Sequence, residues 1–273
     1  MSKQQKKDVY KKVDLSYKDN ALRVTYDIES TPDLFTLAMI HNDAFGLMFF
    51  GDEQFDDLSE EELLDQMKLF AKKEDTLKDM KKDKPEDIDL NVYKYQIGNK
   101  KDMDRLEDDL LTIICCYPLD GDKKFTKHAK SFVEYCGWNS ARYDLDVIIL
   151  TYLLVKKKKE RLSPQSIRHL SNYIIQYQGP PYKFGEYIEE KTKGLIKKQS
   201  YHYFKNMALW SDGHIDWAKI AKKEDGGDEA MMPPGLKKEM ARFGMDIIFD
   251  ETIADDSLKI WSNEERDHLV DYN

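Results

Sequence analysis

The chain has 273 residues, of which 41% are hydrophobic and 35% charged, against an average charged share of roughly 25%. Its net charge of −9 excludes a protein held to nucleic acid by a uniform basic coat, although its 43 Lys and Arg residues suffice for a local basic groove. The N-terminus lacks the apolar segment of a secretion signal, no run of 18 apolar residues occurs, and the three cysteines form no CxxC pair. We therefore expect a soluble, cytoplasmic protein with reduced thiols and no membrane partner.

Three strands are predicted at the start of the chain, in "LRVTYDIES", "FTLAMIHND" and "GLMFF". Apolar side chains alternate with others at Val24 and Tyr26 and again at Phe35, Leu37 and Met39. This period of two is typical of a half-buried sheet. The connections are too short for crossover helices, so the strands are expected to be antiparallel.

Residues 51–111 are predicted to form a charged helical insertion within a single domain that covers residues 1–273. Ser59 and Glu62 form a capping box, which opens a helix expected to run from about residue 60 to about 82. A second, partly buried helix is predicted in "MDRLEDDLLTIICCYPL".

The rest of the chain alternates between strand and helix patterns. A buried strand in "KSFVEYCGWNS" is expected to end at Asn139, and "ARYDLDVIILTYLLVKKKK" has the apolar spacing of a helix that covers a sheet. Further helices are predicted from Ser163, in "MMPPGLKKEMARFG" and from Ser262, with a strand in "MDIIFDE". This order predicts an α/β three-layer fold with a mixed central sheet and an antiparallel first hairpin.

Three carboxylates stand out in this arrangement. Asp27 and Glu29 are two residues apart at the end of the first strand, so they share one face of it. Asp144 begins the helix that follows the strand ending at Asn139, and it meets the other two if these strands are neighbours. Carboxylates on an apolar strand are costly unless a cation accompanies them. Mg²⁺ and Mn²⁺ prefer such ligands, and two such ions about 4 Å apart clamp a phosphodiester.

Two other aspartates are expected to have ordinary roles. Asp146 lies two residues beyond Asp144 on the helix and is predicted to face solvent. Asp216, in "HIDW", either joins the acidic cluster or forms a salt bridge in a loop, and the sequence favours the salt bridge.

The stretches "YDIES", "GWNSARYD" and "HLVDYN" resemble, in order, the three exonuclease motifs of family B DNA polymerases, especially those of phages. The first motif is Asp-x-Glu, matched by Asp27 and Glu29. The second begins with Asn and, after two or three residues, ends in an aromatic residue and Asp, matched by Asn139, Tyr143 and Asp144. The third is Tyr-x-x-x-Asp, and Tyr272 fits its tyrosine.

The resemblance implies a ribonuclease-H-like fold and the removal of nucleotides from the 3′ end of single-stranded DNA, which is proofreading during DNA replication. It implies two Mg²⁺ or Mn²⁺ ions held by Asp27, Glu29 and Asp144, with Tyr272 orienting the attacking water. It also implies that Ser30, Asn139 and Tyr143 contact the 3′-terminal nucleotides. The implied partners are the DNA end and a polymerase domain in the same or another chain, in a bacterium or an infected host cell.

One departure from the family pattern bears on activity. The aspartate of the third motif would fall three residues beyond Asn273, so we expect this chain to be an N-terminal portion of a longer polymerase with impaired cleavage. Two alternatives remain open: a stand-alone exonuclease acting on RNA or DNA, and a degenerate nuclease fold that serves as a nucleic-acid or protein scaffold.

Overall fold

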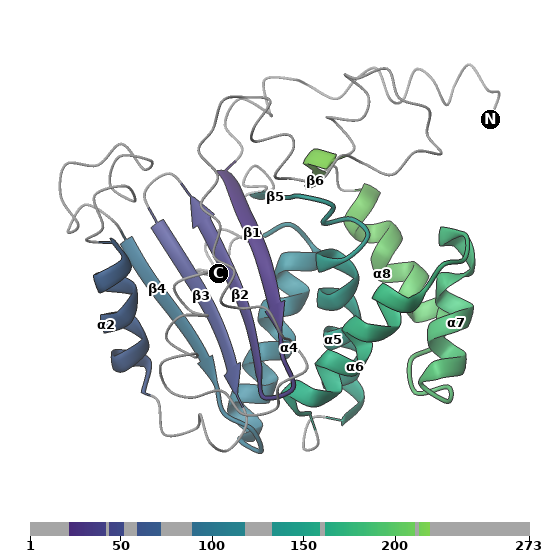
Figure 1. Ribbon diagram of the computed structural model, residues 1–273, viewed down its shortest axis with the longest axis horizontal. Helices are drawn as coiled ribbons and strands as arrows, with labels where there is room; N and C mark the ends of the chain where they lie inside the picture. Colours follow the sequence, from purple (N-terminus) through teal and green to yellow (C-terminus); the bar gives the residue numbers. More distant parts are fainter. Residues whose placement is uncertain are drawn as a thin grey trace.

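The computed structural model describes residues 22–41, 44–51, 59–71, 89–117, 133–158, 162–210 and 213–218. Its centre is a sheet of six strands in the order β4-β3-β2-β1-β5-β6 (Figure 1). The strands are β1 (Leu22–Ser30), β2 (Leu34–His41), β3 (Ala44–Gly51), β4 (Asp89–Tyr95), β5 (Val133–Gly137) and β6 (His214–Asp216).

The first three strands form the predicted antiparallel meander, in which β2 pairs with both β1 and β3. The remaining pairs, β3 with β4, β1 with β5 and β5 with β6, are parallel. The sheet is therefore mixed, as the sequence predicts.

Helices cover the sheet, and Figure 1 shows α2 beside β4 at one flank, with α5, α6, α7 and α8 gathered toward the other. Helix α4 contacts both β4 and α5. Tyr26 and Ile28 of β1 belong to the main core, together with apolar side chains from α4, α5 and α6. Leu47 and Phe49 of β3 alternate with core residues and are buried outside that cluster, as is Leu63 of α2. Both faces of the sheet thus carry buried apolar side chains. The helices are α2 (Glu60–Ala71), α4 (Lys100–Ile114), α5 (Asp144–Lys158), α6 (Pro164–Gln176), η7 (Pro181–Lys183), α7 (Phe184–Lys191) and α8 (Lys198–Trp210).

Several helix starts follow the predicted capping chemistry. Ser59 Oγ accepts a hydrogen bond from Glu62 N at 3.1 Å, and the Glu62 carboxylate accepts one from Ser59 N at 2.7 Å, which confirms the capping box. Ser163 caps α6 by accepting from Ser166 N, with Pro164 as the first helical residue. Helix α2 ends at Ala71, and the remainder of the predicted helix, to residue 82, lies outside the described residues.

The segment 51–111 is not purely helical, which corrects the sequence-based expectation. It contains β4, which extends the sheet beside β3, and most of α4, which packs against α5. Strand β4 carries the polar residues Asn91 and Lys94 among its apolar ones, so its sequence shows no clean alternation. Tertiary pairing with the earlier strand β3, in which Ala44 lies opposite Asp89, decides its conformation.

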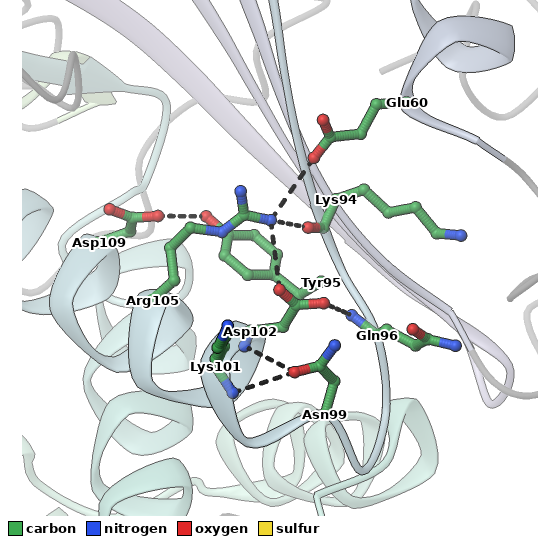
Figure 2. Close-up of polar contacts among 9 residues, drawn as sticks. All are labelled: Glu60, Lys94, Tyr95, Gln96, Asn99, Lys101, Asp102, Arg105 and Asp109. Carbon is green, nitrogen blue, oxygen red and sulfur yellow. Dashed lines mark hydrogen bonds and ion pairs between the residues drawn. The ribbon is translucent and has the colours of Figure 1, made fainter.

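Arg105 of α4 ties the parts of this segment together (Figure 2). Its guanidinium donates to the Lys94 carbonyl oxygen and lies 3.5 Å from the Glu60 carboxylate of α2 and 3.8 Å from that of Asp102. The same group stacks over the Tyr95 ring at 4.9 Å, and Tyr95 Oη donates to Asp109 Oδ2 at 2.6 Å. One cation thus contacts α2, β4 and α4.

Some expectations fall outside what the structure describes: the helix in "MMPPGLKKEMARFG", the strand in "MDIIFDE" and the helix from Ser262. Cys115, Cys116 and Cys136 are present as thiols, in agreement with the prediction of reduced cysteines. Among the described helices, none has the length and apolar character needed to cross a bilayer.

Candidate active site

The end of β1 presents two carboxylates on the face of the sheet opposite the main core. Tyr26 and Ile28 point into that core, so Asp27 and Glu29, which alternate with them, lie on the other face. Asp27 is exposed and Glu29 is half-buried. Nearby protein atoms nonetheless remove enough water to raise the pKa of the Asp27 carboxyl above its usual range, and a hydrogen bond from the Ile28 backbone partly opposes this effect.

A tight turn connects β5 to α5 beside this strand. A Cβ at Gly137 would lie 2.6 Å from Ser140 Cβ and 3.3 Å from the Tyr26 carbonyl oxygen, so only glycine fits where the turn crosses β1. Asn139 has a φ of 57°, in the left-handed region that asparagine tolerates better than most residues. The strand ends at Gly137, two residues before the predicted end, because the chain turns at Asn139.

Asp144 is the first residue of α5, and it is buried, with 3% of its surface exposed. Burial raises the pKa of its carboxyl to about 8, and repulsion from Asp27 is the next largest cause. Glu29 and Asp216 raise it further, while a backbone hydrogen bond lowers it. The parallel pairing of β1 with β5 therefore brings Asp144 within electrostatic range of both β1 carboxylates.

Asp216 belongs to this acidic group, and the predicted loop salt bridge is wrong. The residue ends β6 and is buried, and in the described part of the chain it has no ion-pair partner. Its Oδ1 accepts a hydrogen bond from Ala218 N at 3.1 Å, while its buried Oδ2 has no hydrogen-bond partner. Strand β6 has only three residues, too few for a recognisable sequence pattern. Its pairing with β5 is what places Asp216 beside the other carboxylates.

Asp146 is buried rather than solvent-facing, which also corrects the prediction. Its Oδ1 accepts from Tyr201 Oη at 2.8 Å and pairs with Lys205 Nζ at 2.5 Å, and both partners come from α8. Nothing in the local sequence indicates this arrangement, because the partners lie 55 and 59 residues further along the chain.

The predicted substrate-contacting residues lie around the same place. Ser30 is buried at the end of β1, and its carbonyl oxygen accepts from Arg168 Nη1 of α6 at 2.8 Å. Tyr143 is half-buried, and its hydroxyl is 2.7 Å from Ser171 Oγ of α6. Burial raises the pKa of Tyr143, and the charges of Asp144 and Glu29 raise it while that of Arg168 lowers it. Helix α6, which the acidic motifs do not include, thus borders the site.

Two parts of the prediction stay predictions. Tyr272 and the rest of the third motif lie outside the described residues. Within the ranges that the structure describes, no group of three or more His, Cys, Asp or Glu side chains has a geometry that could hold a metal ion. Comparison with protein-family models, curated proteins and solved structures gives no match for this chain.

Proposed function

We propose that the chain is a metal-dependent 3′–5′ exonuclease module that acts on single-stranded DNA ends, and that it is the proofreading part of a family B DNA polymerase. The observation that carries this proposal is the meeting of the first two motifs. The charges of Asp27 and Glu29 on β1 raise the pKa of Asp144 at the start of α5. In sequence, Asp144 lies 115 residues after Glu29.

The topology supports a ribonuclease-H-like identity for the fold. The antiparallel order β3-β2-β1 continues into the parallel strands β5 and β6, and the acidic residues gather where β1 and β5 end. If the fold has that identity, β4, at the edge of the sheet opposite β6, is an extra strand added to the ribonuclease-H-like sheet.

The residues present fit divalent cations chemically. Burial and mutual repulsion make the charged form of Asp144 unfavourable, and a divalent cation among these oxygens would reverse that effect. Carboxylates are the ligands that Mg²⁺ and Mn²⁺ prefer. Two such ions, when bound, would activate a water molecule and stabilise the developing charge on the phosphate.

In this proposal each residue has a defined task. Asp27 would hold both cations, Glu29 would hold the one that activates water, and Asp144 would hold the second directly or through water. Tyr272 would orient that water. Ser30, Asn139 and Tyr143 contact the terminal nucleotides, the tyrosine partly by stacking. Because the Tyr143 hydroxyl already pairs with Ser171, its ring is the part available for stacking.

A nuclease assay tests the proposal. A 5′-labelled single-stranded DNA oligonucleotide is incubated in Mn²⁺ with this chain, with a version extended past residue 276, and with the Asp27→Asn/Glu29→Gln variant of each. We expect a ladder that shortens from the 3′ end, strongest for the extended protein. The double variant removes two metal ligands and is expected to lower the rate at least about a hundredfold.

The matched control is Glu186→Gln/Glu190→Gln, which neutralises two exposed carboxylates on α7 and is expected to leave the ladder unchanged. An RNA oligonucleotide run in parallel distinguishes a DNA enzyme from an RNA-trimming one. If no version cleaves while circular dichroism shows all of them folded, the enzyme proposal fails and the scaffold alternative stands.

A further inference from the structure

The turn that delivers Asp144 is wider than an ordinary helical turn. The N–H of Leu145 donates to the Ser140 carbonyl oxygen, five residues back, at 2.9 Å. In a regular α-helix that N–H would reach Ala141, four residues back. Such widened turns recur at functional sites, because they change the direction in which a side chain leaves the helix. Asp144 lies inside this one.

The widened turn leaves the Ala141 carbonyl oxygen without the N–H that would ordinarily pair with it. Ala141 is buried, so an unpaired carbonyl there would be costly. Lys205 of α8 supplies the donor, because its Nζ donates to this oxygen. A residue 64 positions further along the chain thus completes the turn.

The same ammonium group also pairs with Asp146 on the next part of α5. The Lys205 and Asp146 side chains are only 13% and 9% exposed, and Tyr201 donates a second hydrogen bond to Asp146. A buried ion pair gains little net stability over a well-packed apolar pair, so stability alone does not account for it. What an apolar pair would not supply is a donor to Ala141.

We propose that Lys205 is a positioning residue, which holds the widened turn at residues 140–145 through the Ala141 carbonyl and Asp146 and so aims the Asp144 carboxyl at β1. The inference rests on the proposed function for its catalytic consequence, whereas the contact itself can be tested without catalysis. Lys205 touches neither substrate nor metal in this proposal, and it acts through Asp144.

The decisive variant is Lys205→Met/Asp146→Leu, which removes both charges together and avoids leaving one buried alone. We expect it to fold but to lose about 10–100-fold in kcat on the single-stranded oligonucleotide, as for other residues that orient a metal ligand. The Mn²⁺ concentration for half-maximal rate is expected to rise, with the KM for DNA within about threefold of the parent value.

Two single variants complete the series. Lys205→Arg retains a cation with several donors and is expected to keep most of the parental cleavage rate. Lys198 is on α8, like Lys205, and forms an exposed ion pair with Glu186 of α7. Lys198→Met removes that pair and is expected to leave the cleavage rate unchanged. A Lys205→Met/Asp146→Leu protein with parental kcat and Mn²⁺ dependence would overturn the proposal, because the pair would then serve the fold alone.

Limited trypsin digestion gives a readout that does not depend on nuclease activity. Arg142 is exposed within the turn, so the rate of cleavage after it, followed by mass spectrometry, reports opening of the turn. Faster cleavage in the double variant than in the parent, at equal overall stability, is the expected result even if the parent is not a nuclease. Equal cleavage rates would show that Lys205 does not hold the turn.

Discussion

Asp144 links the candidate site to the stability of the fold through its protonation. Its carboxyl has a pKa of about 8 in the folded protein, against 3.8 as the reference value. Between these two values the folded state holds a proton that the unfolded chain releases, so the free energy of unfolding falls as the pH rises through this window. The buried Asp144 carboxyl therefore costs the fold stability at neutral and higher pH, and strongly perturbed pKa values of this kind are common at functional sites.

Replacement of this one residue makes the cost measurable. The variant Asp144→Asn has no charge to bury, so at about pH 8 without divalent cations it should unfold with a free energy higher by on the order of a few kcal/mol. Urea denaturation of parent and variant at about pH 5 and pH 8 checks this. The gain should shrink at the lower pH. A variant that is less stable than the parent at the higher pH contradicts the assignment of a buried, repelled carboxyl.

At the scale of elements, β4 and α4 depend on contacts that cross the segment 51–111. Arg105 joins the Lys94 backbone, the Tyr95 ring and the Glu60 carboxylate, so it holds an edge strand between two helices. An edge strand with a partner on one side only needs such cover. Some of the charged residues that mark this segment in the sequence therefore form tertiary contacts.

Arg105→Ala should destabilise the protein by about 1–2 kcal/mol, because a backbone hydrogen bond and a cation–π contact are lost together. Lys68→Ala is the matched control, since it removes an exposed ion pair with Asp65 that lies within α2 alone and should cost less than about 0.5 kcal/mol. Urea titrations of both variants decide the matter. Equal effects would mean that the Arg105 contacts are ordinary surface pairs.

At the scale of the whole molecule, the acidic site stands where β1, the β5–α5 turn and β6 come together, with α6 and α8 behind it. Binding of a divalent cation there would stabilise the folded state, because the unfolded chain does not assemble these ligands. It would also release the proton that Asp144 holds.

Mg²⁺ should therefore raise the melting temperature Tm, and the increase should grow between about pH 6 and about pH 8.5 as less proton competes for Asp144. Differential scanning fluorimetry with Mg²⁺ or with matched NaCl measures it. In Asp27→Asn/Glu29→Gln the increase should vanish. An increase that does not depend on pH, or that survives in this variant, places the cation elsewhere.

Local patterns in the sequence were enough to predict the elements whose signals lie within a few residues. Alternation and short connections predict the three-stranded meander, and Ser59 and Ser163 predict helix starts because a capping side chain bonds within its own turn. The spacing of two between Asp27 and Glu29 likewise places them on one face. The ordered motifs also singled out Asp144 as a candidate site residue.

Which distant residues contact one another could be read only from the folded chain. Several features depend on partners dozens of residues away in sequence. They are strand β4, the burial of Asp146 and Asp216, and the contacts of Arg168 and Lys205. A sequence pattern reports which face a side chain occupies within its own element, whereas hydrogen-bond partners and electrostatic environment arise from the packing of elements against one another. Residues that hold a site from behind are therefore the ones that local patterns miss.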